Sequence, residues 1–322
     1  MKLIIGFITY NNLTGKYLPF FLPSLLSSLA VSGLEETDWQ IMAVDNSELK
    51  DNDNRAYISA NYPQIDFTWA GDNLGFSKGY NLMLDRAVKL EAEYFLMLNP
   101  DMLLEPESIK NLLLALEANG HLGSVAPEIL QWNFLANQKT NIIDTLGLRL
   151  LPGLRFIDSG QGQIDFGGLD NLEILGPSGA AGMFRLKALE AILVGNQYFD
   201  ERFFMYKEDC DLSYRLFLAG FKSQLVATAV MYHDRTAKVV GRDLLATLKN
   251  RRHKSRVVNK WSFLGQQIIY SKYWSGQNFN SRLRIAFDQI RYLFLALLFE
   301  HYLLPEYGHL WFRLKSHKSL KK

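Results

Sequence analysis

Short apolar runs alternate with longer amphipathic segments over the first 120 residues of the chain. The runs are four to six residues long and occupy residues 3–8, 41–44, 65–69 and 94–98. Runs of this length, bounded by turns, are typical of strands buried on both faces of a sheet. Helical periodicity appears over residues 18–30, 77–91 and 107–118. Because strands and helices alternate, the sequence predicts an α/β fold with a mainly parallel central sheet.

Polar or turn-forming residues follow each of the four runs. They are Thr9-Tyr10-Asn11-Asn12, Asp45-Asn46-Ser47, Gly71-Asp72-Asn73 and Asn99-Pro100-Asp101. Ligands of open α/β sheets bind beyond the carboxyl ends of the strands, so we expect a ligand site at this edge. Asn, Asp and Gly also form turns and helix caps, which leaves a structural interpretation open for each segment taken alone.

Asp101 interrupts an otherwise apolar stretch, "FLMLNPDMLL" at residues 95–104. A buried carboxylate without a partner costs several kcal/mol. The sequence therefore predicts a compensating partner for Asp101.

Charge is distributed unevenly along the chain. Residues 1–234 hold 17 Lys and Arg against 29 Asp and Glu, whereas residues 235–322 hold 18 against 4. The basic tail is predicted to be mainly helical, and its longest uninterrupted apolar stretch, residues 292–299, is too short for a spanning helix of about 20 residues. Two interpretations remain open: an amphipathic helix on an anionic membrane surface, or a helical extension packed on the main domain. We expect no nucleic-acid partner, because no recognised binding motif accompanies the charge.

Cysteine usage and the first residues bear on location. The chain has one cysteine, Cys210, and is 48% hydrophobic, so it can bury a core but cannot form an internal disulfide framework. The apolar start turns polar too early for a signal peptide. We expect a cytoplasmic protein, at the inner face of the plasma membrane if its tail binds lipid, and leave a homodimer open.

Six segments in a fixed order carry a family resemblance. They are "FITYNN", "VDNS", "NLGFSKGYN", "LNPDM", "GPSGAAGMFRLKAL" and "FDERFFMYKEDCDLSYRL". In this order and spacing the chain resembles family 2 glycosyltransferases over residues 2–235, most closely the bacterial rhamnosyltransferase-like branch. The resemblance implies a GT-A catalytic domain at residues 1–235, followed by a basic, mainly helical region at 236–322. It also implies inverting transfer of a sugar, L-rhamnose from dTDP-L-rhamnose for this branch or else a UDP-sugar. The acceptor would be a hydroxyl of a glycan or lipid-linked saccharide in cell-surface polysaccharide synthesis.

The resemblance also implies which residues contact the donor. Asp45 would contact the base or ribose, Asn73 and Gly75 would lie beside the nucleotide, and Asn99 could bond the ribose. Thr9, Tyr10 and Asn11 would complete the donor site. Asp45 could equally hold an Asx turn, and Asn73 and Gly75 could equally cap and pack a helix.

A divalent cation, Mg²⁺ or Mn²⁺, is implied by the segment "NPD". Relatives carry Asp-x-Asp there, and Asn99 replaces the first Asp, which leaves Asp101 as the expected direct ligand. By the same resemblance His233 would be a second ligand. A lone histidine after a strand is also an ordinary core or surface residue, and that alternative stays open.

Three carboxylates within four residues, Glu208, Asp209 and Asp211, repel one another unless something separates them. Asp211 can pair with Arg215 four residues along a helix. The resemblance makes Asp209 the general base and Glu208 an acceptor-side hydrogen-bonding group, although all three acids could simply occupy a helix N-terminus. Gly179 and Gly182 of the glycine-rich segment would shape the sugar side of the site.

Two other classes of function fit the sequence less well. A catalytically silent nucleotide-sugar-binding scaffold of polysaccharide assembly would keep the fold, but the intact acidic set argues against it. A nucleotide-dependent oxidoreductase is not expected, because no dinucleotide-binding glycine pattern follows the first strand.

Overall fold

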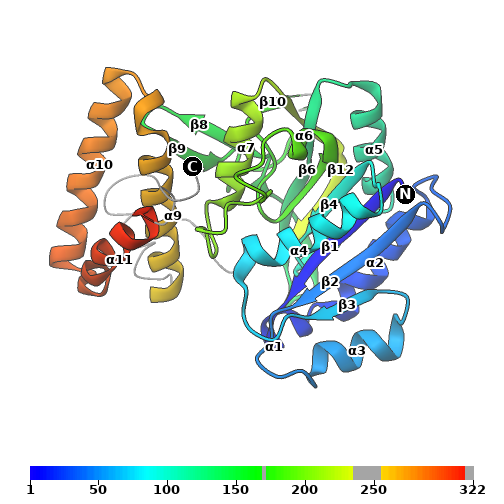
Figure 1. Cartoon of the computed structure of the whole chain (residues 1–322). Helices are drawn as coiled ribbons and strands as arrows, with labels where there is room; N and C mark the ends of the chain where they lie inside the picture. Colours follow the sequence, from blue (N-terminus) through cyan, green and yellow to red (C-terminus); the bar gives the residue numbers. More distant parts are fainter. Residues whose placement is uncertain (169–171, 235–254, 316–322) are drawn as a thin grey trace.

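The computed structural model describes residues 1–168, 172–234 and 255–315, without the side chains of His309 and residues 311–315 (Figure 1). The strands are β1 (Leu3–Thr9), β2 (Trp39–Asp45), β3 (Asp66–Trp69), β4 (Tyr94–Leu98), β5 (Met102–Leu104), β6 (Leu122–Asn133), β7 (Gln138–Thr145), β8 (Leu148–Leu151), β9 (Arg155–Asp158), β10 (Glu173–Ile174), β11 (Ala181–Arg185) and β12 (Lys222–His233). The helices are α1 (Asn11–Gly15), α2 (Leu18–Ala30), α3 (Asp53–Asn61), α4 (Gly75–Lys89), α5 (Ser108–Ala118), α6 (Leu186–Glu190), α7 (Glu208–Leu218), α9 (Arg256–Tyr273), α10 (Phe279–Leu298) and α11 (Leu304–Lys315). Two short 3-10 turns, Trp274–Gly276 and His301–Leu303, connect the last three helices.

The first half of the central sheet is parallel, as the alternation of elements predicts. Strands pair in the order β4-β1-β2-β3, and every pair among them is parallel. Their carboxyl ends therefore meet at one edge. The four apolar runs form these four strands, and the polar residues that follow them lie at this edge, as expected. Strand β4 has the predicted bounds.

The second half of the sheet is mixed rather than parallel. Strand β11 runs antiparallel to both of its neighbours, β4 and β6, while β12 runs parallel to β6 and antiparallel to β5. The predicted α/β fold is confirmed, and the antiparallel strands β5, β7, β10 and β11 are added to the parallel pairs, which include β6 with β12. The glycine-rich segment at 176–189 supplies β11, an antiparallel strand between β4 and β6, so β6 and β12 run in the same direction as β4.

Helices cover both faces of the sheet (Figure 1). One core joins the sheet to α2 and α5, and a second joins its other face to α4, α6 and α7. The central strands, such as β4, are consequently buried along their whole length. This burial on both faces explains why they are continuous apolar runs in the sequence.

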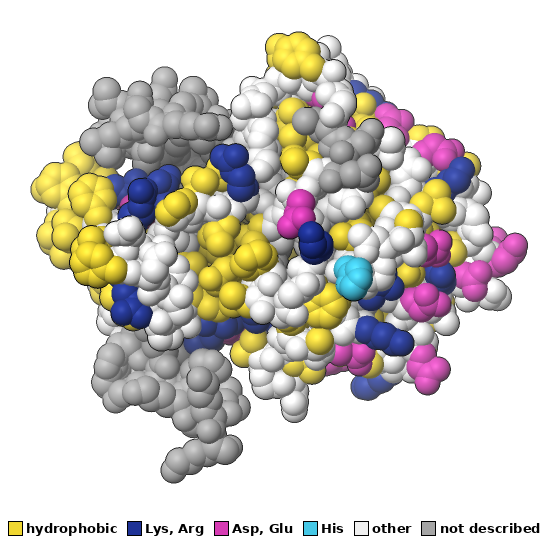
Figure 2. Space-filling model, turned by 90° about the horizontal axis from the view of Figure 1, so that it is seen from above, with side chains coloured by type: hydrophobic (Ala, Val, Ile, Leu, Met, Phe, Trp, Pro, Cys, Tyr) yellow, Lys and Arg dark blue, Asp and Glu magenta, His cyan; other side chains and the backbone are white. Residues whose placement is uncertain are grey.

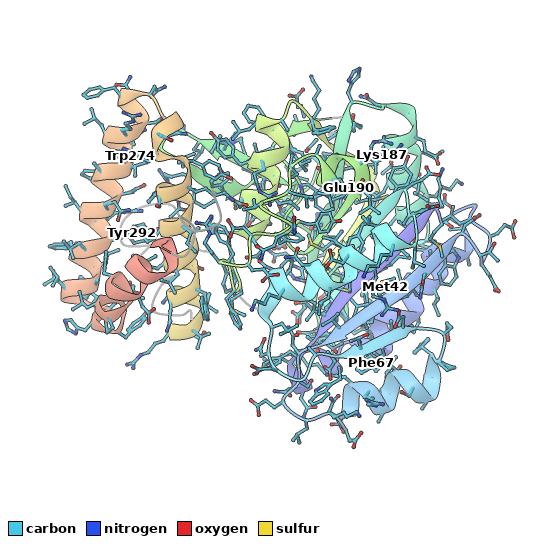
Figure 3. All side chains as sticks on the ribbon, viewed as in Figure 1. Met42, Phe67, Lys187, Glu190, Trp274 and Tyr292 are labelled. Carbon is cyan, nitrogen blue, oxygen red and sulfur yellow. The ribbon has the colours of Figure 1, made fainter. Side chains whose placement is uncertain are left out.

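The C-terminal helices pack on the main domain through a small hairpin. Strands β8 and β9 pair with each other and share a core with α7, α9 and α10. Nε2 of Gln266 on α9 donates a hydrogen bond of 3.0 Å to the carbonyl of Leu154 in the hairpin turn. Tyr292 of α10 points toward α9, where its ring meets Phe263 at 5.6 Å between centroids (Figure 3). The described part of the C-terminal region is thus helical and packs on the main domain, which is one of the two interpretations. Residues 236–254 lie outside the described residues.

None of the described helices is both long enough and apolar enough to cross a bilayer.

A buried ionic network anchors α9. Asp211, fully buried in α7, accepts hydrogen bonds from Nε of Arg215 at 2.8 Å and from the hydroxyl of Tyr273 at 2.7 Å. Nζ of Lys272 lies 2.7 Å from Oδ1 of the same carboxylate and 2.9 Å from Asp200. The predicted pair of Asp211 with Arg215 is confirmed. Burial alone would raise the pKa of Asp211, but Arg215 and Lys272 outweigh it and lower that pKa below its usual value.

Replacing Asp211 by Asn is expected to destabilise the fold by about 3–5 kcal/mol, because two buried cations lose their counter-charge. Urea unfolding at pH 7 measures the loss, with Asn at the exposed Asp51 as the matched control. Because the pKa of Asp211 is lowered on folding, its stabilisation is present above about pH 4 and disappears as pH falls further. The gap between wild type and variant should therefore narrow only below about pH 4, and a difference under about 1 kcal/mol at pH 7 would contradict the network's role.

Candidate active site

Asp45 joins the loops that follow β1 and β2. Its Oδ1 accepts hydrogen bonds from the hydroxyls of Thr9 at 2.8 Å and Ser47 at 2.6 Å, and its Oδ2 accepts one from Nδ2 of Asn52 at 2.7 Å. The side chain is fully buried. Asp45 therefore fixes the shape of the strand-end loops. Its contact with a donor base stays a prediction.

Asn11 and Tyr10 begin the first of these loops. The amide of Tyr10 donates to the hydroxyl of Thr14 at 2.8 Å, and the amide of Asn11 donates to the hydroxyl of Ser47 at 2.8 Å. Asn11 has φ 45°, in the left-handed region that Asn tolerates better than most residues. The loop is thus held in a defined, partly exposed conformation beside Asp45.

Gly75 brings a third loop to the same edge. Nδ2 of Asn46 donates to the carbonyl of Gly75 at 3.0 Å, and the amide of Gly75 donates to Oδ1 of Asn73 at 3.0 Å. Gly75 has φ 72°, and a Cβ there would lie 2.4 Å from the carbonyl oxygen of Phe204. Only glycine fits this approach. Asn73 therefore forms an Asx turn just before α4, whose N-cap residue is Leu74, while its donor contact stays a prediction.

Asp101 finds its partner in His233. The antiparallel pairing of β5 with β12 sets Met102 opposite His233, which brings the histidine beside the end of β4. Nε2 of His233 lies 3.3 Å from Oδ2 of Asp101. On the other side of the ring, Nδ1 lies 2.8 Å from Oδ2 of Asp144, a buried residue of β7. The compensating partner that the sequence predicts for Asp101 is therefore present.

Electrostatics make His233 a cation between two carboxylates. Burial alone would lower the pKa of the imidazole, but Asp101 and Asp144 outweigh it and raise that pKa to about 10. The ring is thus protonated at neutral pH. An imidazole that ligates a metal must be neutral, so binding of a cation here would release this proton.

Asp101 and His233 fit a divalent cation as a pair. Oδ1 of Asp101 is buried and accepts no hydrogen bond from a described residue. A histidine whose far nitrogen is held by a carboxylate, as Asp144 holds His233, is a common arrangement behind a metal ligand. Across the described ranges, no three His, Cys, Asp or Glu side chains converge to hold a metal. Water and donor phosphates would have to complete the coordination, which suits Mg²⁺ or Mn²⁺, and the imidazole favours Mn²⁺.

Backbone pairing connects Asp101 to Asp209. The amide of Asn99 donates to the carbonyl of Ala180 at 2.8 Å, and the amide of the adjacent Gly179 donates to Oδ2 of Asp209 at 2.9 Å. The amide of Cys210 donates to the other oxygen of Asp209 at 2.7 Å. A Cβ on Gly179 would lie 3.5 Å from that carboxylate, an ordinary van der Waals distance, so the space at this position does not require glycine. Gly182 is instead a packing residue, since a Cβ there would lie 2.4 Å from Cβ of Pro177.

Glu208 has a different environment from its neighbour. It is buried at the start of α7, and its Oε2 has no hydrogen-bond partner among the described residues. Burial, aided by the charge of Asp209, raises the pKa of Glu208 well above its usual value. A carboxyl group kept neutral in this way can donate a hydrogen bond.

Strained backbone precedes these two acids. Tyr206 and Lys207 both have left-handed conformations, with φ 67° and 76°. Such conformations cost about 1–3 kcal/mol each in non-glycine residues and are concentrated at functional sites. Helix α9 supports them: a Cβ on its Gly265 would lie 2.5 Å from the carbonyl oxygen of Tyr206.

Two residues of the site were missed by sequence reasoning. Asp144 lies in a strand whose pairing with β6 is invisible locally, and no motif marks it. Phe204 sits within "FDERFFMYKEDCDLSYRL", but only its carbonyl contact with the loop of Gly75 reveals its role.

A curled mixed sheet, three loops at the ends of its parallel strands and an acidic helix start beside them make up the architecture of the GT-A fold. The sequence matches the family model described as glycosyl transferase family 2 over residues 4–193, which is more than half of the chain. The chain therefore belongs to glycosyl transferase family 2. The search of curated proteins finds no significant match.

Solved structures share this fold at low identity. The crystal structure of S. aureus TarS is similar with a TM-score of 0.51 at 15% identity, over 78% of this chain and 38% of TarS. For S. aureus TarS 1-349 the TM-score is 0.52 at 14% identity, over 96% of this chain and 79% of that one. GalNAc-T7, solved with UDP, GalNAc and Mn²⁺, gives 0.54 at 12% identity, over 84% of this chain and 50% of its own. The chain thus spans well under half of the length of TarS and half of GalNAc-T7.

Proposed function

We propose that the protein is an inverting glycosyltransferase that moves a sugar from a nucleotide-sugar donor to a hydroxyl group of a glycan or lipid-linked saccharide. The observation that carries this proposal is the chain of contacts from Asp101 through Asn99, Ala180 and Gly179 to Asp209. These contacts bring two acidic residues to one edge of the sheet. Asp101 would suit a metal ion that binds the donor phosphates, and Asp209 would suit proton transfer. Family membership supports the same reaction.

The proposed reaction is a single in-line displacement at the anomeric carbon. Asp209, held by the amides of Gly179 and Cys210, takes the proton of the acceptor hydroxyl as its oxygen attacks. General base catalysis of this kind contributes about 10²–10⁴-fold. Glu208 lies next to it and would hydrogen-bond the acceptor. The loops of Thr9, Tyr10 and Asn11, of Asp45 and of Asn73 and Gly75 would enclose the nucleotide, with Asn99 at the ribose.

Asp101 and His233 would hold a divalent cation on the donor pyrophosphate. When bound, the cation stabilises negative charge on the departing nucleoside diphosphate as a Lewis acid. Asp144 would orient His233 from behind, through the 2.8 Å contact with Nδ1. The presence of UDP and Mn²⁺ in the structure of GalNAc-T7, which shares the fold, supports this proposal.

The donor is proposed to be dTDP-L-rhamnose, on the resemblance to the rhamnosyltransferase-like branch alone, with UDP-sugars as the alternative. Cell-surface polysaccharide synthesis in the cytoplasm is the proposed setting. Incubation of the purified chain with dTDP-, UDP- and GDP-sugars, read by mass spectrometry, tests it. We expect turnover of one donor class in the presence of Mn²⁺. No hydrolysis or transfer from any donor, with nucleotide binding retained, would instead favour a silent binding scaffold.

Replacing Asp144 by Asn is expected to weaken Mn²⁺ binding about 10–100-fold, because the imidazole loses the carboxylate that orients it. Electron paramagnetic resonance of free Mn²⁺, titrated in the presence of a nucleoside diphosphate, measures the affinity without any turnover. The exposed Asp51 replaced by Asn is the matched control. Unchanged Mn²⁺ affinity in the Asp144 variant would remove Asp144 from the site.

A further inference from the structure

Helix α10 carries an apolar face that no described element covers. Its six central members, defined here as the outer face, are Leu283, Phe287, Ile290, Phe294, Leu297 and Leu298, each between 52% and 69% exposed. On its opposite side the helix buries Ile285, Leu295 and Ala296 against the rest of the protein. A helix apolar on both sides needs a second partner, since contiguous apolar surface of this extent marks an interaction site.

Figure 2 shows this surface from above: hydrophobic side chains gather at the end of the molecule formed by the C-terminal helices, with Lys and Arg side chains next to them.

A basic pocket adjoins the outer face. It has a volume of about 400 Å³ and lies between α10 and the β8-β9 hairpin, with Arg155, Arg284 and Arg291 among its lining residues. Two members of the outer face, Leu283 and Phe287, form its apolar wall. The pocket therefore combines three guanidinium groups with aliphatic and aromatic surface.

The one carboxylate that lines this pocket is already engaged. Oδ2 of Asp288 accepts a hydrogen bond of 3.1 Å from the hydroxyl of Tyr270, and its Oδ1 lies 3.0 Å from Arg291. Nε of Arg291 has no hydrogen-bond partner among the described residues. Neither Arg155 nor Arg284 has a carboxylate within ion-pair distance in the described part of the chain. The pocket is therefore electropositive.

We propose that the outer face of α10 and its basic pocket form a docking surface for an anionic lipid bilayer. The apolar side chains would enter the region between headgroups and acyl chains, and the arginines would bind lipid phosphates. Residues 235–322 hold 18 Lys and Arg against 4 Asp and Glu, so the sequence of this region as a whole favours an anionic partner. The surface is independent of the chemistry proposed for the site.

A second copy of the chain is the competing occupant. The positions 283, 287, 290, 294 and 297 repeat at alternating intervals of four and three, as in a coiled coil. Charge argues against this pairing. The outer face offers no carboxylate among the described residues to meet the arginines of another copy. A bilayer of anionic lipid supplies that opposite charge.

The test uses the full chain and vesicles of two compositions. One is phosphatidylcholine alone, and the other is phosphatidylcholine with about 30 mol% of the anionic lipid phosphatidylglycerol. Flotation should recover the protein with the anionic vesicles, and far less with the neutral ones. Replacing both Phe287 and Phe294 by Ser should lower anionic-vesicle binding at least about 10-fold. Replacing Arg284 by Gln should lower it about five-fold, since each basic residue at the surface is worth about 1 kcal/mol. Leu82 and Leu114, exposed on α4 and α5, give the matched control when both become Ser.

Several outcomes would overturn the proposal. They are failure of the wild type to float with anionic vesicles, undiminished binding by the phenylalanine variant, or equal binding to both vesicle types. Sedimentation velocity without lipid tests the competing occupant: a dimer that the phenylalanine substitutions dissociate would assign the outer face to a second copy. Circular dichroism checks that each variant is folded, and the Arg284 variant tests the pocket should the phenylalanine variant unfold. Donor hydrolysis in solution reports on the reaction separately.

Discussion

Replacing Asp209 by Asn is expected to lower the rate of sugar transfer by about 10²–10⁴-fold, because the amide cannot take the proton of the attacking hydroxyl. The substitution preserves the size of the side chain, and its Oδ1 can still accept a hydrogen bond from the amide of Gly179 or Cys210. Nucleotide affinity should therefore change little. Single-turnover transfer measures the rate, and calorimetry with the nucleoside diphosphate measures the binding.

Glu190 provides the control for this experiment. It lies with Lys187 on α6, which follows β11 and therefore sits at the opposite end of β4 from the site (Figure 3). Gln at Glu190 should leave transfer unchanged. Full transfer activity in the Asp209 variant would remove Asp209 as the base, whereas loss of both transfer and nucleotide affinity would show that the substitution disturbs the loop itself.

Removing the divalent cation with EDTA, or replacing Asp101 by Ala, is expected to lower transfer at least about 100-fold. Stabilisation of the charge on the leaving diphosphate by a metal is worth several kcal/mol, and each 1.4 kcal/mol is a factor of ten. Added Mn²⁺ should restore the chelated wild type but not the variant. Transfer rates with a metal titration supply the measurement.

The Asp101 variant has a second expected consequence that needs no turnover. Loss of one of its two carboxylates should lower the pKa of His233 from its raised value, visible in the histidine resonances of the metal-free protein. Activity indifferent to both EDTA and the loss of Asp101 would contradict the metal proposal. A lowered pKa of His233 together with normal activity in the Asp101 variant would confirm that Asp101 contacts His233 in the wild type, but would show that transfer does not need this contact.

The sequence predicts the N-terminal half of the fold well because its elements are locally determined. Strands buried on both faces must be continuous apolar runs, and helix α2 has the bounds that its periodicity indicates. The pairing of Asp211 with Arg215 follows from helix geometry alone. Each of these predictions depends on residues within a few positions of each other.

Contacts between distant segments could not be predicted in this way. Asp144 meets His233 across 89 positions, and only the sheet pairing brings them together. Asp45 accepts hydrogen bonds from Thr9, Ser47 and Asn52, partners that no local pattern reveals, and its donor contact stays a prediction. The sequence shows which side chains can form hydrogen bonds and leaves open which of them do so with each other.

Helix α9, in the C-terminal region, contacts the loop that precedes α7. Trp261 of α9 stacks on Phe204 with ring centroids 4.6 Å apart, and Gly265 packs against the carbonyl of Tyr206. Phe204 in turn accepts a hydrogen bond from the amide of Phe76, at the start of α4. Helix α9 therefore supports two loops of the candidate site. A protein cut after residue 235 would lose these contacts and should hold the two loops poorly, so the proposed lipid binding and the proposed sugar transfer are best separated by point substitutions.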